Sequence, residues 1–181
     1  MRTILSRFRF RVINLLGLLG GTAWLAGCTT FSAPVIQEPF NPTTHRVVKI
    51  EPCENRTGFT GERNLKDEAT RIFSEKIKAM NLFQVSADAP LLFTCDIESF
   101  KEGNALKRWV VPGWGATDAT VAVVVRDIAT RRILVVTRSQ QEVGGGGLFS
   151  IGANEYILDR AFNDIIKQLE AWAKPGRKEA R

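Results

Sequence analysis

Residues 91–100, Leu-Leu-Phe-Thr-Cys-Asp-Ile-Glu-Ser-Phe, alternate between apolar and polar side chains and decide the fold. An alternation of this kind is typical of a β-strand that is buried on one face only. The apolar face carries Leu91, Phe93, Cys95 and Ile97, and the other face carries Leu92, Thr94, Asp96 and Glu98. The stretch therefore predicts a sheet with one covered face and one open face.

Three further segments alternate in the same way between turn-forming residues. They are residues 46–52, 119–126 and 132–143. Together with residues 91–100 they predict a four-stranded mixed sheet.

Two segments have the period of amphipathic helices, residues 65–80 and 154–173. Asn64 can cap the first helix, with Asp67 at the third position, and Asn81 can follow it in the left-handed conformation. The order of elements is then β-α-β-β-β-α. We expect an α+β fold, a two-layer sandwich in which both helices pack on one face of the four-stranded sheet.

The charge of the chain does not favour a nucleic-acid partner. The chain has 181 residues, with 25 Lys and Arg against 19 Asp and Glu. Four of these arginines lie in the first 27 residues, which contain no acidic residue, so 21 basic and 19 acidic side chains remain beyond them. A net charge of +2 on the remainder is too small to indicate a nucleic-acid surface. The apolar fraction of 44% indicates a globular domain and not a polytopic membrane protein.

The first 27 residues are predicted to be a signal peptide that is removed. Basic residues between Arg2 and Arg11 precede an apolar stretch at residues 12–26. As a helix this stretch would be about 22 Å long, too short for a hydrocarbon core of about 30 Å. Residues 25–28, Leu-Ala-Gly-Cys, resemble the lipobox of bacterial lipoproteins. The resemblance implies cleavage before Cys28 and attachment of lipid, palmitate included, to the new N-terminal residue.

An ordinary secretory signal followed by an unmodified Cys28 is the alternative to the lipobox. Thr29 follows the cysteine, and by resemblance to lipoproteins of enteric bacteria it implies the outer membrane. Because two or more acyl chains anchor a protein stably, we expect a tethered protein whose domain faces the periplasm.

The rest of the chain is predicted to be a tether, one domain and a tail. Residues 28–44 contain three prolines and no periodicity, and as an extended tether they would reach about 50 Å. Sustained periodicity is confined to residues 45–174, the expected periplasmic α+β domain. Residues 175–181 are expected to be a charged, flexible tail.

Three stretches of the domain carry a resemblance to known proteins. Residues 47–58, Val-Val-Lys-Ile-Glu-Pro-Cys-Glu-Asn-Arg-Thr-Gly, resemble the first strand and turn of the TolB amino-terminal and curli-secretion lipoprotein superfamily, with Cys53 in place of Phe. Residues 97–132, with an Asn-x-x-x-Arg-Trp turn and a Gly-Trp-Gly loop, and the glycines at 144–147 complete the pattern. This order resembles an uncharacterised family of bacterial lipoproteins, domain of unknown function 4410. The resemblance implies the fold and a lipid anchor, and it implies no activity.

Arg131 departs from the pattern of that family, in which the turn after Asp127 ends in Gly. If the backbone has a positive φ at this position, Arg131 destabilises the fold by about 1 kcal/mol.

Asp96 and Glu98 are the candidate catalytic pair, because they point the same way from one strand and paired carboxylates can perform acid–base chemistry. The same residues can form ion pairs with Arg126 and Arg138 across the open face, and we favour this structural interpretation. His45, the single histidine, is expected to be solvated. One histidine and scattered cysteines supply no usual zinc site, so no metal is expected.

Cys53 and Cys95 would meet an oxidising periplasm. Regular alternation places Cys53 on the face opposite to Cys95, which favours free thiols. Pro52 leaves a disulfide open, because it can turn the strand. The glycines at 144–147 precede a helix but lack the Lys and Ser/Thr of a phosphate-binding loop, so we expect a flexible connection and no cofactor.

Residues 107–115, Lys-Arg-Trp-Val-Val-Pro-Gly-Trp-Gly, are predicted to be a loop and are the most informative segment for function. Trp side chains in loops anchor interfaces, and Arg pairs with phosphate or carboxylate groups. Arg108, Trp109 and Trp114 are therefore the candidate partner-binding residues. The alternative, that both rings fold back and cap the core, stays open.

These observations predict a non-enzymatic lipoprotein, anchored in the outer membrane through Cys28. Its periplasmic domain is expected to bind a protein partner in envelope assembly, secretion or the control of cell-wall synthesis. One alternative is a domain that binds a small ligand or a lipid. The other is an enzyme that acts through Asp96 and Glu98.

Overall fold

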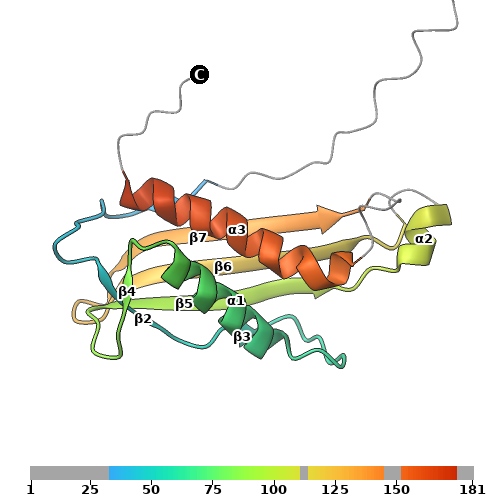
Figure 1. Cartoon of the computed structure of the whole chain (residues 1–181), viewed down its shortest axis with the longest axis horizontal. Helices are drawn as coiled ribbons and strands as arrows, with labels where there is room; N and C mark the ends of the chain where they lie inside the picture. Colours follow the sequence, from blue (N-terminus) through green and yellow to red (C-terminus); the bar gives the residue numbers. More distant parts are fainter. Residues whose placement is uncertain (1–32, 111–113, 145–151, 175–181) are drawn as a thin grey trace, which may run out of the picture.

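Two helices cover one face of a mixed β-sheet in the computed structural model (Figure 1). The structure describes residues 33–110, 114–144 and 152–174. Three long antiparallel strands form the centre of the sheet, β5 (Leu91–Lys101), β6 (Thr117–Asp127) and β7 (Ile133–Val143). The predicted α+β class with a mixed sheet is confirmed.

The sheet is wider than the predicted four strands, since the described residues form seven. β2 (Val47–Ile50) and β3 (Glu54–Asn55) pair parallel with β5, and β4 (Gln84–Val85) pairs parallel with β2. β1 (Val35–Ile36) pairs antiparallel with β7, so the strand order is β1-β7-β6-β5-β2-β4, with β3 also beside β5. The three strands that the sequence did not predict have two residues each, too few to show a period.

α1 (Leu65–Ala79) and α3 (Ala153–Ala173) pack side by side on the apolar face of the sheet (Figure 1). Asn64 caps α1 as predicted, since its Oδ1 accepts a hydrogen bond from the backbone N–H of Asp67 at 3.2 Å. Asn81 follows α1 with a φ of 54°, in the predicted left-handed conformation. Large apolar side chains from both layers are fully buried, among them Phe73, Phe93, Ile97, Phe162, Ile165 and Trp172.

A third helix, α2 (Ala105–Val110), lies in the segment for which the sequence predicted a loop. That prediction is wrong for residues 107–110, which belong to the helix. Asn104 supplies a cap, because its Oδ1 accepts a hydrogen bond from the backbone N–H of Lys107 at 3.1 Å.

The second half of the predicted tether packs on the domain. Val35 and Ile36 pair with Val136 and Val135 of β7. The backbone oxygen of Glu38 then accepts a hydrogen bond from Nε1 of the buried Trp172 at 2.8 Å. Residues 35–38 are therefore bound to both layers, and the tether does not extend freely to residue 44.

His45 is half-buried and is not the solvated side chain that the sequence suggested. Its ring stacks on Trp172 with centroids 5.9 Å apart, and it contacts Phe40 edge to face at 5.7 Å. Its Nδ1 accepts a hydrogen bond from the backbone N–H of Asn41 at 2.9 Å. Desolvation in this cluster lowers the pKa of His45, and the negative charge of Glu38 partly opposes this effect.

Cys53 and Cys95 form a disulfide, so the prediction of free thiols is wrong. The reason lies in the register: Ile50 is paired with Phe93, whereas Glu54 is paired with Asp96. Glu54 follows Ile50 by four residues, whereas its partner Asp96 follows Phe93 by only three, so the segment between Ile50 and Glu54 contains one extra residue. The extra residue, at Pro52, reverses the face of every residue that follows, and Cys53 turns inward.

Arg131 has a φ of 60° in the turn between β6 and β7. The turn is closed by a hydrogen bond from the backbone N–H of Asp127 to the backbone oxygen of Arg132 at 2.9 Å. Thr130 adds a second bond from its backbone N–H to Oδ1 of Asp127 at 2.7 Å. The position therefore has the left-handed backbone that glycine adopts freely, and Arg131 destabilises it by about 1 kcal/mol.

Loss of the disulfide should reduce the stability of the domain strongly. The bond joins residues 42 positions apart, and a loop of that length lowers the entropy of the unfolded chain by an amount worth about 4 kcal/mol. We expect the free energy of unfolding, measured in denaturant, to fall by about this amount in Cys53→Ala/Cys95→Ala. The free energy of unfolding of the wild type, measured in the presence of a reductant, should equal that of the variant. Two alkylatable thiols at these positions in the non-reduced wild type would contradict the assignment.

Acidification should destabilise the domain through His45. Because the pKa of His45 is lower in the folded state, the unfolded state binds the proton more readily. The free energy of unfolding should therefore decrease as the pH falls below about 6.5, down to the folded pKa. His45→Asn removes the titrating group, and its stability should depend less on pH in that window. Parallel curves for wild type and variant, measured by denaturant unfolding from about pH 7.5 to 5, would exclude this role.

Candidate interaction surface at the α2 end of the sheet

α2 projects from one end of the sheet, beyond the N-terminal end of α3 (Figure 1). It follows β5, and β6 begins shortly after Trp114. We call residues 104–110 together with 114–115 the tip. The tip contains the predicted partner-binding residues Arg108, Trp109 and Trp114. The side chains of Arg108 and Trp109 lie outside the described part of the structure.

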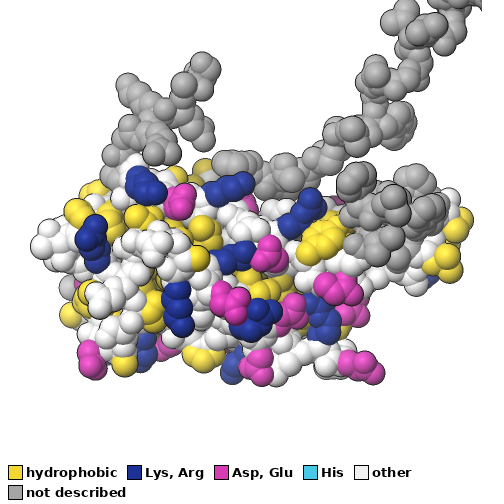
Figure 2. Space-filling view, viewed as in Figure 1, with side chains coloured by type: hydrophobic (Ala, Val, Ile, Leu, Met, Phe, Trp, Pro, Cys, Tyr) yellow, Lys and Arg dark blue, Asp and Glu magenta, His cyan; other side chains and the backbone are white. Residues whose placement is uncertain are grey.

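The tip exposes large apolar side chains to solvent. Leu106 is 75% exposed, Val110 is 70% exposed and Trp114 is 57% exposed. Hydrophobic side chains are visible at this end of the molecule in Figure 2. For Trp114, the alternative that the ring caps the core is therefore wrong. Apolar side chains grouped on a projecting element are typical of a binding surface.

A cation lies next to the exposed indole ring. Nζ of Lys107 is 5.7 Å from the centroid of the Trp114 ring, within the range of a cation–π interaction. This contact joins the helix to the chain segment that returns from it. It also places a positive charge at the border of the apolar surface.

The two ends of the tip, at Asn104 and Gly115, lie in close contact through their backbones. The backbone N–H of Asn104 donates a hydrogen bond to the backbone oxygen of Gly115 at 3.0 Å. Gly115 has a φ of +78°, and a Cβ atom there would lie 2.9 Å from the Asn104 oxygen and 2.9 Å from Cβ of Lys107. Glycine is therefore required where the two ends of the tip meet.

Asn154, near the start of α3, fastens the base of the tip to the helical layer. Its Oδ1 accepts hydrogen bonds from the backbone N–H of Gly103 at 3.0 Å and from Oγ1 of Thr117 at 2.7 Å. Its Nδ2 donates to the backbone oxygen of Gly103 at 3.3 Å. One amide thus binds the chain on both sides of the tip. Sequence reasoning did not find this residue, since nothing in its spacing links it to residues 51 and 37 positions away.

The candidate catalytic carboxylates form ion pairs on the open face of the sheet. Glu98 pairs with Arg138 at 2.5 Å, as predicted. Asp96 pairs with Arg56 at 3.0 Å and not with Arg126, the other predicted partner. Burial raises the pKa of Asp96, while the charge of Arg56 acts in the opposite direction. Both carboxylates have a cationic partner, which is the structural arrangement that we favoured.

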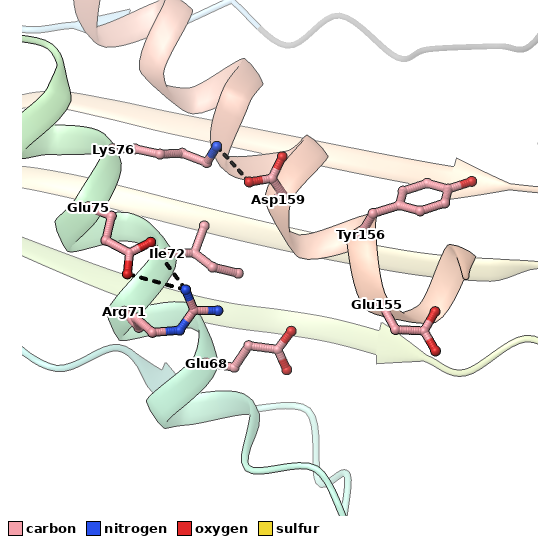
Figure 3. A pocket seen from close by; sticks show the side chains of 8 residues that line it. All are labelled: Glu68, Arg71, Ile72, Glu75, Lys76, Glu155, Tyr156 and Asp159. Carbon is pink, nitrogen blue, oxygen red and sulfur yellow. Dashed lines mark hydrogen bonds and ion pairs between the residues drawn. The ribbon is translucent and has the colours of Figure 1, made fainter. Parts of the chain in front are cut away.

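A shallow groove of about 290 Å³ lies between α1 and α3 (Figure 3). Its polar side chains form pairs across it and along α1: Lys76 with Asp159 at 2.6 Å, and Arg71 with Glu75 at 3.1 Å. Tyr156 and Glu155 lie at its α3 side (Figure 3). A charged, open groove of this kind differs from the apolar concave sites that hold most small ligands.

Several predictions concern residues outside the described part of the structure. These are the signal peptide at residues 1–27, the lipidation site Cys28, the tail at 175–181 and the glycines at 145–147. Within the described residues, no helix is both long and apolar enough to cross a bilayer. The same residues contain no group of three or more His, Cys, Asp or Glu side chains arranged to hold a metal ion.

No family model and no curated protein matches the chain, but solved structures do. The PelC dodecamer from Paraburkholderia phytofirmans is 12% identical, with a TM-score of 0.53 over 79% of this chain and 96% of that chain. The hypothetical protein CT253 from Chlamydia trachomatis is 16% identical, with a TM-score of 0.51 over 72% and 99%. The lipoprotein GNA1162 from Neisseria meningitidis matches with a TM-score of 0.47, 8% identity and coverage of 69% and 98%.

The matches to PelC and CT253 show that the fold is shared, and at these identities they show nothing further. The match to GNA1162 is too weak to support an argument. The resemblances to domain of unknown function 4410 and to the TolB and curli-secretion domains are not confirmed by these comparisons.

Substitution of Gly115 should loosen the tip, and Gly58 offers a matched control. Both have a positive φ, but a Cβ atom at Gly58 would have no atom within 4 Å. Gly58→Ala should lower the free energy of unfolding by about 1 kcal/mol through backbone strain alone. Gly115→Ala should lower it by about 1–3 kcal/mol more, because Asn104 and Lys107 must move. An equal loss in the free energy of unfolding for the two variants, measured in denaturant, would contradict the close approach of Gly115 to Asn104 and Lys107.

Proposed function

We propose that this chain is a lipid-anchored protein of the bacterial outer membrane that acts without catalysis, by binding a protein partner in the periplasm. The observation that carries the proposal is the exposed apolar tip, in which Lys107 contacts the ring of Trp114 and Gly115 allows the two ends of the tip to meet. Envelope assembly, secretion and the control of cell-wall synthesis are the processes in which such a protein would work.

The disulfide supports a location outside the cytoplasm. Structural disulfides persist in oxidising compartments such as the periplasm and are rare in reducing ones. Cys53 and Cys95 are both buried, which is typical of a bond that stabilises the fold. This support is independent of the lipobox at residues 25–28, since it comes from a different part of the chain.

The energetics of the tip suit protein binding. Burial of one large apolar side chain contributes about 1.5–3 kcal/mol, and Trp is enriched among the residues that dominate binding energy. Leu106, Val110 and Trp114 together would supply most of the energy of a small interface. The positive charge of Lys107 at the border favours a partner with carboxylates around an apolar pocket.

The two alternatives have less support. An enzyme would need Asp96 or Glu98 free to exchange protons with a substrate, whereas each is held by an arginine. A small-ligand or lipid-binding protein would need a concave apolar site, and the groove between α1 and α3 is charged and open. A second copy of this chain is one possible partner, since PelC, which shares the fold, is described as a dodecamer.

Acylation of Cys28 is tested by metabolic labelling. Labelled palmitate should enter the wild-type protein in cells, and the label should be lost in Cys28→Ala. Cys53→Ala/Cys95→Ala serves as the control, because it removes the other two cysteines and should still take up the label. Label that persists in Cys28→Ala would refute the anchor.

Partner binding is tested by crosslinking in cells followed by mass spectrometry. Trp114→Ser should reduce the yield of the crosslinked partner at least about tenfold, the effect of removing a dominant interface residue. Ile128→Ser is the matched control: Ile128 is 45% exposed, but it lies in the turn between β6 and β7, at the opposite end of the sheet.

Crosslinking combined with native mass spectra of the purified protein gives two outcomes that contradict the proposal and one that identifies the partner. Equal crosslinking of Trp114→Ser and wild type, with both folded by thermal unfolding, would show that the tip is not the binding surface. Purified protein that carries a tightly bound lipid in native mass spectra, with no protein partner in the crosslinks, would favour the ligand-binding alternative. A crosslink between two copies of this chain that is lost in Trp114→Ser would identify a second copy of the chain as the partner.

A further inference from the structure

α3 presents a row of basic side chains on the face directed away from the sheet. Arg160, Lys167 and Lys174 are spaced seven residues apart, and all three are exposed. A step of seven residues returns to nearly the same face of an α-helix, with a drift of about 20°. Dark-blue side chains follow the upper border of the molecule in Figure 2, above α3. We call these three residues the α3 basic row.

The basic row forms no ion pair with a carboxylate of the described residues. Elsewhere on the domain many cations are paired with carboxylates, as in the pairs of Lys76 with Asp159 and Arg132 with Glu38. The guanidinium of Arg160 instead lies 5.2 Å from the centroid of the Tyr156 ring.

Two acidic residues are close to the row on the same helix. Asp164 lies four residues after Arg160 and three before Lys167, and it accepts a hydrogen bond from Nε2 of Gln168 at 3.2 Å. The half-buried Glu170 lies three residues after Lys167 and four before Lys174, so both carboxylates are neighbours of the row. The sequence after Lys174 adds Arg177, Lys178 and Arg181 against Glu179. The C-terminal dipole of α3 accounts for a cation at Lys174, but Arg160 and Lys167 lie too far from the helix end for this effect.

The point at which the chain joins the domain lies beside α3. Trp172 of α3 donates its hydrogen bond to Glu38, and β1 lies on the adjacent sheet edge. Ala33, the first described residue, lies five positions after Cys28, with four residues between them. Fully extended, this segment spans about 17 Å, so an acylated Cys28 would hold Ala33 within that distance of the bilayer surface. This is much shorter than the reach of about 50 Å that a free tether up to residue 44 would give.

We infer that the α3 basic row docks on the surface of an anionic phospholipid bilayer, the same bilayer to which the proposed acyl anchor attaches. This inference rests on the proposed function, because without the anchor nothing brings α3 to a membrane. Positive side chains of a tethered protein are attracted to anionic headgroups over about one Debye length. The docked domain lies with α3 along the bilayer, and the tip points along the membrane surface toward neighbouring envelope proteins.

The expected strength follows from the number of cations. Each Lys or Arg near an anionic bilayer raises the docking equilibrium constant by roughly fivefold, so three raise it on the order of a hundredfold. Because the interaction is electrostatic, salt should weaken it. Insertion of the tip into the same bilayer would instead depend on Leu106 and Trp114 and would resist salt.

The test places a fluorophore on α3 in the acylated full-length protein, reconstituted in vesicles of phosphatidylethanolamine with about 30% phosphatidylglycerol. Ala171→Cys provides a labelling site on the exposed face of α3, between Lys167 and Lys174. Gln140→Cys, on the exposed open face of β7 and therefore on the side of the sheet opposite to the helices, is the control site. Lipids that carry a quencher in the headgroup report the distance of each label from the bilayer.

We expect the label at position 171 to be quenched at least about twofold more than the label at position 140 at low salt. The difference should disappear in Arg160→Gln/Lys167→Gln/Lys174→Gln, in vesicles without phosphatidylglycerol, and in about 0.5 M salt. Equal quenching at the two sites, or a difference that survives the triple substitution, would refute docking through α3. A difference lost only in Trp114→Ser would assign the membrane contact to the tip.

Flotation of the vesicles separates failure of this inference from failure of the proposed anchor. If Cys28 is not acylated, the protein does not float with the vesicles under any condition, which refutes both. If the protein floats but the two labels are quenched equally, the anchor stands and docking through α3 is refuted.

Discussion

Burial of one apolar sheet face is the constraint on which the rest of this structure depends. β5, β6 and β7 each direct apolar side chains to one face, and such a sheet is stable in water only where a second layer covers that face. α1 and α3 provide the layer, and the rings of Phe73, Phe93 and Phe162 join it to the sheet with centroids 5.5–6.2 Å apart. Because α2 lies beyond the N-terminal end of α3, its side chains Leu106 and Val110 find no such cover (Figure 1).

The tip and the helical layer are mechanically connected although they lie at different places in the sequence. Asn154 binds Gly103 and Thr117 on either side of the tip, so displacement of α3 would disturb the base of the tip. The tether contacts the same helix near its other end, through Trp172. α3 therefore links the side of the domain where an anchored chain would enter to the end where a partner would bind. This arrangement fixes the orientation of the proposed binding surface relative to the side on which the tether joins the domain.

Local patterns in the sequence were sufficient for the long elements and for several of their ends. Alternation identified β5, and side-chain chemistry placed the cap at Asn64 and the left-handed residue at Asn81. The same rules failed for strands of two residues and for α2, which is too short to show a period. They also failed at Cys53, where a single extra residue at Pro52 reverses the face, and a pattern that assumes regular alternation cannot include such a bulge.

The sequence alone determined the α+β class and the layered arrangement, since these depend on periodicity and composition. Only the tertiary structure decided which side chains meet: the disulfide between Cys53 and Cys95, the pairing of Asp96 with Arg56, and the contact of Lys107 with an exposed Trp114. It also decided that half of the expected tether belongs to the domain. The physical reason is that pairing across a sheet joins residues distant in sequence, and a shift of one residue exchanges the buried and the exposed faces.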